Sequence, residues 1–229
     1  MRLLAVETAT ESCSAALLVE GEIICRAEVA PRRHAALILP MAQELLDEAG
    51  LTVAQLDLLA FGRGPGSFTG VRIAASVTQG IAFAADLPVM PVSTLTAIAQ
   101  GALRTRGSKR VLAAIDARMG ELYWSACECG PGGVMRACGE ERLGAADTVP
   151  LPSGGGWCGA GSGWRGYGEI LAERLGGRMQ GTYPEIHPQA RDVALLAAHA
   201  VESGVVPVPA EQVEPVYLRN RVTTAPPPS

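Results

Sequence analysis

A chain of 229 residues with 48% hydrophobic and 18% charged side chains can bury one large core or two smaller ones, which excludes a disordered protein. The formal net charge of −4 argues against a protein whose main task is to bind nucleic acid. No apolar run is long enough to cross a bilayer, and Glu7 comes too early for a signal peptide, so we expect a cytoplasmic protein without membrane contact.

Three short β segments open the chain. Apolar runs at 3–6, 15–19 and 23–29 predict the start of a β-meander.

Residues 34–50 carry apolar side chains at helical spacing and end on a glycine, which predicts a helix. Pro40 lies inside this segment, so we expect a bend or a late start of the helix.

The next segments alternate between strand and helix. Residues 56–64 predict a buried strand that leads into a glycine-rich loop. A helix at 70–86, a strand at 87–93 and a helix at 94–103 follow.

Beyond residue 109 the opening pattern begins again. Residues 110–137 predict strand, acidic turn, strand, turn and strand, and Asp116 ends its strand as Glu7 ends the first one. This similarity indicates two copies of one unit, so we place one lobe at 1–104 and a second at 105–220.

The end of the chain is less regular. A glycine-rich stretch is followed by a helical pattern, and the last helix, predicted at 190–204, is free to pack back on the first lobe. Residues 221–229 have no apolar anchor, and we expect them to be disordered.

The six cysteines follow no metal-binding or redox spacing. No two of them form a C-x-x-C pair, which argues against a zinc ribbon and a thioredoxin-like site. Without secretion, disulfides are not expected either, and we interpret the cysteines as small, buried or half-buried thiols.

The stretch FGRGPGSFTGVRIA, residues 61–74, allows two interpretations. It matches neither the Walker loop, which needs a lysine after its last glycine, nor the G-x-G-x-x-G fingerprint. A glycine turn before a helix still presents N–H groups to an anion, so phosphate binding stays open. The structural alternative has Ser67 or Thr69 capping the helix.

Small residues along the 70–86 helix favour this structural alternative. A thin helix face allows another backbone to come close, and the neighbour is either the 34–50 helix or a helix of a partner. The small residues are Gly70, Ala74, Ala75, Ser76, Gly80 and Ala84.

The chain resembles the TsaB (YeaZ) family in four places. GRGPGSFTGVRIAASVTQGIAFAADLPVMPVSTL resembles the family's signature, and LLAVETATESCSAALL resembles its opening. AAIDARMGELYWSA resembles the start of its second half, and EPVYLRN resembles its C-terminal end.

The resemblance implies a two-lobed α/β fold of the actin/sugar-kinase/Hsp70-like (ASKHA) type, in which a β-meander and its helices are duplicated. It implies a role in forming N6-threonylcarbamoyladenosine (t6A) next to the anticodon of tRNA. There a TsaB protein is the non-catalytic companion of TsaD, a metal-holding homologue that transfers the threonylcarbamoyl group. A small ATPase, TsaE, joins the pair, and tRNA is reached only through the complex.

The resemblance also implies a partner interface on the first two helices, 34–50 and 70–85. The same face is expected to form a homodimer when TsaD is absent. The candidate interface residues are His34, Leu37, Ile38, Met41, Leu45, Gly70, Arg72, Ala74, Val77 and Ile81.

Catalytic motifs are not found in the sequence. Two histidines one helical turn apart would be needed for the metal of the active homologue, and His34, His187 and His199 form no such pair. Ser67 lacks the glycines of a G-x-S-x-G nucleophile elbow. We therefore expect no metal site and no catalytic residue.

A nucleotide-like cleft is the remaining candidate site. In the superfamily, acids after the first strand of each lobe face nucleotide and magnesium, and a glycine-rich segment holds the adenosine. The matching residues are Glu7, Thr8, Asp116, Gly159, Gly161 and Gly163. Two departures weaken this interpretation, because Glu is longer than the usual Asp and because Trp157 and Trp164 can fill the cleft. We favour the alternative that both acids bond local backbone, and expect no cofactor, with weak binding of ATP, ADP or Mg²⁺ left open.

Two further functions stay open. The paired acids suggest a free-standing nucleotide- and Mg²⁺-dependent enzyme of the same superfamily. The apolar face of 34–50 suggests a homodimeric interaction protein without a role in tRNA modification.

Overall fold

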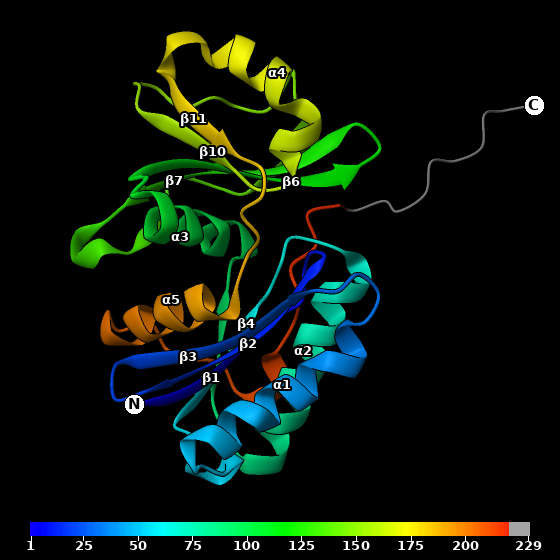
Figure 1. The fold of residues 1–229 in the computed structure, drawn as a ribbon, viewed down its shortest axis with the longest axis vertical. Coiled ribbons are helices and arrows are strands. Elements are labelled where there is room, and N and C mark those ends of the chain that lie inside the picture. The colour runs from blue at the N-terminus through cyan, green and yellow to red at the C-terminus, as the bar shows by residue number, and fades with distance from the viewer. Residues whose placement is uncertain (220–229) are drawn as a thin grey trace, which may run out of the picture.

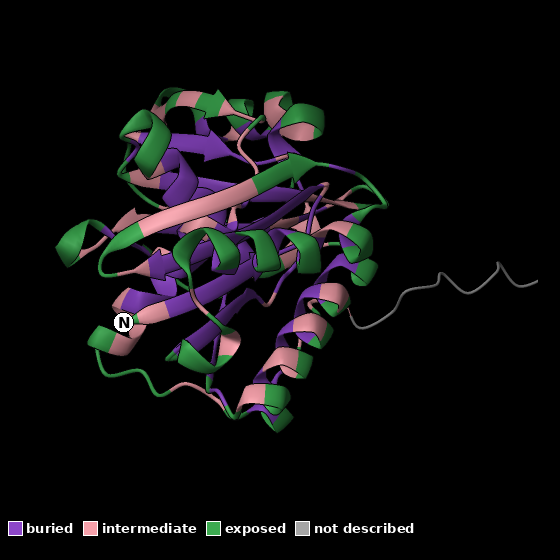
Figure 2. Ribbon diagram, turned by 60° about the horizontal axis from the view of Figure 1, so that its bottom comes forward, coloured by how far each residue is buried: buried purple, intermediate pink, exposed green. Residues whose placement is uncertain are grey.

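The computed structural model describes residues 1–219, and Figure 1 shows them as a stack of layers in which helices and two sheets alternate. Each sheet carries helices on both faces, so the central strands are buried from both sides, as the purple strands of Figure 2 show. No helix within these residues is long and apolar enough to span a membrane.

The first sheet has five strands in the order β3-β2-β1-β4-β5. The strands are β1 (Arg2–Glu7), β2 (Ser12–Val19), β3 (Glu22–Val29), β4 (Leu58–Gly62) and β5 (Val89–Val92). The first three form the expected antiparallel meander, and β4 and β5 extend the sheet in parallel to β1.

Three helices cover the first sheet. Helices α1 (His34–Ala49) and α2 (Phe68–Ala85) lie on one face, and α5 (Ala190–Glu202) lies on the other (Figure 1). Helix α1 begins at His34 and continues through Pro40, so the helix does not start late as the proline suggested. Pro40 is exposed, and a proline ring is tolerated best where the carbonyl that it leaves unpaired can meet water.

The second sheet has the order β11-β10-β6-β7-β8, and β9 pairs with β7 beside β8. The strands are β6 (Arg110–Arg118), β7 (Glu121–Cys129), β8 (Met135–Ala137), β9 (Arg142–Ala145), β10 (Trp157–Ala160) and β11 (Met179–Tyr183). Helix α4 (Gly163–Leu175) packs on its outer face and α3 (Thr94–Arg106) on its inner face.

The two sheets repeat one topology. In each, an antiparallel meander (β1–β3, β6–β8) is extended by two parallel strands (β4 and β5, β10 and β11), and a helix joins those two strands. This repeat confirms the predicted two-lobed α/β fold of the actin-like class. The division of the chain near residue 104 stays a prediction, because α5 comes from the second half and packs on the first sheet.

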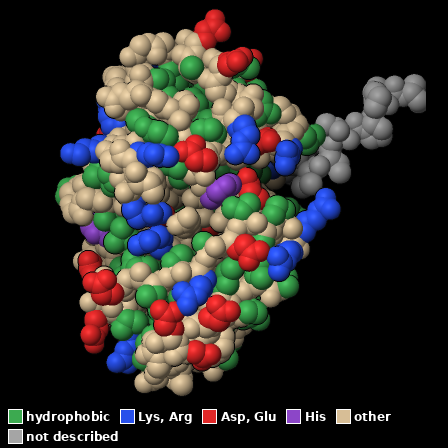
Figure 3. Space-filling view, viewed as in Figure 1, with side chains coloured by type: hydrophobic (Ala, Val, Ile, Leu, Met, Phe, Trp, Pro, Cys, Tyr) green, Lys and Arg blue, Asp and Glu red, His purple; other side chains and the backbone are tan. Residues whose placement is uncertain are grey.

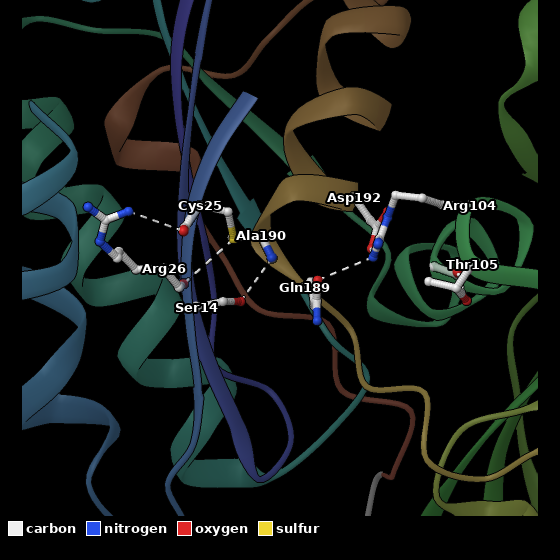
Figure 4. A network of polar contacts seen from close by, with 9 residues as sticks. Ser14, Cys25, Arg26, Arg104, Thr105, Gln189, Ala190 and Asp192 are labelled. Atoms are coloured by element: carbon white, nitrogen blue, oxygen red, sulfur yellow. Dashed lines mark hydrogen bonds and ion pairs between the residues drawn. The ribbon is translucent and has the colours of Figure 1, made fainter. Parts of the chain in front are cut away.

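A polar network holds α5 in the middle layer (Figure 4). The Ser14 hydroxyl of β2 accepts a hydrogen bond from the Ala190 N–H at 2.9 Å, which satisfies one orphan donor at the start of α5. Arg104 of α3 binds both carboxylate oxygens of buried Asp192, at 2.9 and 2.8 Å. The last helix is thereby tied both to the first sheet and to the α3 helix that supports the second.

Sequence patterns missed three short strands, β9, β10 and β11. Each has four or five residues, and each contains a glycine that weakens the apolar pattern of a strand. Their positions are set by pairing and not by local propensity: β9 pairs with β7, β10 pairs with β6, and β11 pairs with β10.

Residues 205–219, here called the C-terminal strap, return along the first lobe. Val208 bridges to Val89 of β5, a short 3-10 turn at Ala210–Gln212 packs near α2, and the Val216 N–H donates to the Arg63 carbonyl at 2.8 Å. The tail predicted to be disordered, 221–229, lies outside the described residues.

Candidate functional site

The glycine loop between β4 and α2 is packed against its own chain. The Ser67 N–H donates to the Ala9 carbonyl at 2.7 Å, and the Ser67 hydroxyl caps α2 by accepting from the Gly70 N–H at 3.4 Å. A Cβ added to Gly70 would lie 2.1 Å from the Thr8 carbonyl oxygen, so only glycine fits there. The Thr8 hydroxyl donates back to the Gly70 carbonyl at 2.7 Å. The loop thus fastens α2 to the turn between β1 and β2, which supports the structural interpretation.

Glu7 is buried beneath this loop. Its side chain is 0% exposed, and a Cβ on Gly62 would meet a carboxylate oxygen at 1.9 Å, so the glycine makes room for the acid. The carboxylate accepts hydrogen bonds from the Ala9 N–H at 2.7 Å and from the Thr94 hydroxyl at 3.0 Å. Burial raises the pKa of Glu7 from 4.5 to about 7, and these hydrogen bonds act in the opposite direction.

Asp116 makes local bonds in the corresponding turn of the second lobe. Its carboxylate accepts from the Arg118 N–H at 2.8 Å and pairs with the Arg118 guanidinium at 3.2 Å. Its own N–H donates to the Ser162 hydroxyl at 3.3 Å. Both candidate acids therefore bond backbone within two residues of themselves, as the turn interpretation expects.

The three candidate adenosine glycines contact core side chains. A Cβ on Gly159 would lie 2.3 Å from the Trp164 indole, which donates its N–H to the Leu112 carbonyl at 2.8 Å. Gly161 and Gly163 pack on Ala114 of β6. These glycines allow α4 to lie close to the sheet, and Trp164 fills the space that they leave. Trp157, the other tryptophan suspected of filling the cleft, is buried at the start of β10.

Metal-binding groups do not cluster in the described part of the chain: within residues 1–219 no group of three or more His, Cys, Asp or Glu side chains could hold an ion. His34 is buried at the start of α1, and its Nε2 atom has no hydrogen-bond partner among these residues. His187 lies 3.8 Å from Glu11, and His199 packs against Gly132. The three histidines belong to separate neighbourhoods.

The candidate interface residues on α1 and α2 divide into two groups. Six are buried within this chain: His34, Ile38, Met41, Leu45, Gly70 and Ala74. These six positions pack inside the chain, so they are not available to a partner. At Gly70 and Ala74, the small residues of α2 therefore allow close packing inside this chain. The remaining four stay accessible, with Leu37, Val77 and Ile81 half-buried and Arg72 exposed.

A groove lies on the outer surface between α1 and α2. It has a volume of about 410 Å³ and is lined by Ala35, Phe68, Thr69, Arg72, Ile73, Ser76 and Val77. Large apolar side chains on the same two helices are exposed, at 48% for Phe68, 50% for Leu39 and 56% for Phe83. Single exposed apolar residues are normal, whereas several on two neighbouring helices that also carry a groove are typical of a binding surface. We call this surface, the groove with Leu39 and Phe83, the outer face.

Sequence reasoning missed several members of this face. Phe68, Ile73 and Phe83 belong to a helix that carries large apolar side chains on both its inner and its outer side, so an apolar pattern alone does not place them. Apolar residues in excess of those that one buried face needs were the signal in the sequence that could have indicated a binding surface.

The C-terminal strap contacts two residues that line the groove, Phe68 and Arg72. The Tyr217 ring lies 5.9 Å from the Phe68 ring, and its hydroxyl accepts from Arg72 Nε at 2.8 Å. The Arg72 guanidinium lies 3.4 Å from the centre of the Phe68 ring. Three residues from two distant segments thereby form one stacked group at the start of α2.

Comparisons with known proteins agree with the architecture. A family model described as "TsaD: tRNA N6-adenosine threonylcarbamoyltransferase" matches residues 26–158. The tRNA threonylcarbamoyladenosine biosynthesis protein TsaB of Escherichia coli is 42% identical, with 97% of this chain and 96% of that protein aligned. Its namesake from Haemophilus influenzae is 40% identical, with 97% and 95% aligned.

A solved structure gives the same result. YeaZ from Pseudomonas aeruginosa is 47% identical and superimposes with a TM-score of 0.87, covering 95% of this chain and 99% of that one. Identity at this level along nearly the whole length confirms the predicted resemblance, and the chain belongs to the TsaB (YeaZ) family.

Proposed function

We propose that this chain is a non-catalytic subunit that binds a TsaD-family transferase and supports it in forming threonylcarbamoyladenosine in tRNA. The observation that carries the proposal is the 42% identity over 97% of the chain to a protein named for the biosynthesis of this nucleoside. The proposal keeps the cytoplasmic location expected from the sequence.

The outer face is the proposed docking surface for TsaD. It is apolar, grooved and accessible, and the two helices that carry it are held rigidly on the first sheet by buried side chains such as Ile38 and Leu45. Rigid apolar surfaces of this kind favour tight binding because little order is lost on association. The same face would form a homodimer when TsaD is absent, and TsaE would join the heterodimer.

The way in which the candidate acids are held favours a supporting role. Glu7 is sealed under the glycine loop, and Asp116 is bonded to its own turn, so neither is set up to receive a nucleotide or Mg²⁺. These contacts favour a subunit over the nucleotide-dependent enzyme. On the face seen in Figure 3, acidic and basic side chains are interspersed over both lobes, unlike the continuous basic surface of a protein that binds tRNA directly.

A genetic test addresses the role. The protein is expressed in a strain that lacks its own TsaB, and threonylcarbamoyladenosine in bulk tRNA is measured by mass spectrometry. Rescue to the level given by the strain's own gene supports the proposal. No rescue, although the protein is present together with the TsaD of its own organism, would refute it.

A binding test addresses the surface. Leu39→Glu places a carboxylate on the outer face and should abolish the complex with TsaD in light scattering on a sizing column, since a buried unpaired charge is costly. Ile170→Glu is the matched control, because Ile170 is a similarly exposed apolar residue on α4 of the other lobe. Met41→Glu is unsuitable, since Met41 is buried and its loss would unfold the lobe.

A further inference from the structure

The side chain of Arg72 is immobilised at the rim of the outer face. Its guanidinium stacks on the Phe68 ring, 3.4 Å from the ring centre, and lies 5.5 Å from the centre of the Tyr217 ring. Its Nε donates to the Tyr217 hydroxyl at 2.8 Å. An arginine so held has lost most of its rotamer freedom before any partner arrives, so the entropic cost of using it in a complex is small.

The strap that brings Tyr217 to this place is anchored on both sides. Val216 is bonded to Arg63 of the first lobe. Arg219 donates to the Ala117 carbonyl of the second lobe at 3.1 Å and pairs with Glu121 at 2.7 Å. Tyr217 is therefore a fixed support for Arg72, although the two residues are 145 positions apart.

The outer edge of the Arg72 guanidinium has no acidic partner among residues 1–219. Nε is used by Tyr217, and neither Nη group is within hydrogen-bond or ion-pair distance of an acceptor in this part of the chain. The two Nη groups of an arginine form a planar fork that fits both oxygens of one carboxylate.

We propose that Arg72 is a charged anchor of the outer face, and that it receives an aspartate or glutamate of the docked TsaD-family partner. Phe68 and Tyr217 are positioning residues that hold the fork toward the partner. The inference rests on the proposed docking of TsaD to this face, and it adds a specific requirement, which is a carboxylate of the partner opposite Arg72.

The experiment compares the affinity for TsaD at two salt concentrations, by calorimetry, for the full-length wild type and four variants. Arg72→Gln should raise Kd at low salt about tenfold and should flatten the dependence of Kd on salt, because a charge-assisted bidentate pair is lost. Arg72→Lys should recover part of the salt dependence but little of the affinity, since an ammonium cannot form the fork.

Two further variants separate positioning from charge. Tyr217→Phe keeps the charge and the ring and removes only the hydroxyl, so it should weaken binding less than Arg72→Gln while the salt dependence remains. Arg165→Gln removes an exposed arginine from α4 and should leave Kd and its salt dependence unchanged. Thermal melting of each variant shows that the fold is kept.

Failure of this inference is distinguishable from failure of the proposed function. If wild-type protein binds TsaD and Leu39→Glu does not, but Arg72→Gln binds like the wild type at both salt concentrations, the docking face stands and the charged anchor is wrong. If the wild type does not bind TsaD at all, the proposed function itself fails, and the anchor with it.

Discussion

Replacing Glu7 by glutamine should change how the stability of the protein depends on pH. The wild-type carboxyl is buried and has a pKa of about 7 in the folded state, against 4.5 for the exposed group. Because folding raises this pKa, the stabilising contribution of the protonated acid is complete below pH 4.5 and is lost as pH rises through 7.

The magnitude follows from the shift. Each unit of pKa difference corresponds to about 1.4 kcal/mol, so ionisation of Glu7 should cost about 3 kcal/mol of unfolding free energy once the pH is above 7. Glutamine has the same shape and cannot ionise. Its carbonyl can accept from the Ala9 N–H and its amide can donate to the Thr94 hydroxyl oxygen, so the buried site stays satisfied.

The assay is urea denaturation of wild type and Glu7→Gln at pH 5 and pH 8, followed by circular dichroism. From pH 5 to pH 8, the free energy of unfolding of Glu7→Gln should rise relative to that of the wild type by about 2 kcal/mol. Glu22→Gln, which removes an exposed carboxylate from β3, is the control and should show no such change. A Glu7→Gln curve that runs parallel to the wild-type curve over this range would show that Glu7 is not desolvated as the structure indicates.

Two further predictions concern packing and are checked by the same denaturation assay. Asp192→Ala should cost about 3 kcal/mol or more, because it leaves the partly buried guanidinium that clamps Asp192 without its partner; a loss below 1 kcal/mol would contradict a structural role for the clamp. Gly70→Ala should cost about 3 kcal/mol, because its Cβ would enter a backbone carbonyl of the β1–β2 turn. Gly166→Ala, on the exposed side of α4 with no atom near its Cβ, should instead stabilise by about 0.5 kcal/mol, and equal effects at the two glycines would refute the close-contact argument.

Local signals in the sequence predicted much of the fold. The meander at the start of each half, the helix at 34–50 and the helix cap at Ser67 or Thr69 were predicted from residues close together in the chain. The structure has both meanders and the helix, and the cap is Ser67. The interpretation of Asp116 as a turn residue also rested on a local signal, because Arg118, whose N–H donates to the Asp116 carboxylate, is two positions away.

The candidate site depended on contacts that no local pattern contains. Helix α2 carries large apolar side chains on its outer side as well as on its inner side, so its packing on β4 and α1 decides that Ala74 is inside and Phe68 is outside. Glu7 and Thr94 are 87 positions apart, and no pattern around either residue indicates that one hydroxyl and one glycine would enclose the acid.

The sequence by itself therefore determined the repeated unit, the order of most elements and the family, since these rest on short-range periodicity, turn chemistry and a recognisable signature. Tertiary structure alone decided which side of α1 and α2 stays exposed and which arginine is held against Tyr217 there. The physical reason is that burial and hydrogen-bond satisfaction are properties of the packed chain, in which Tyr217 and Arg72 are in contact although they lie 145 positions apart in the sequence.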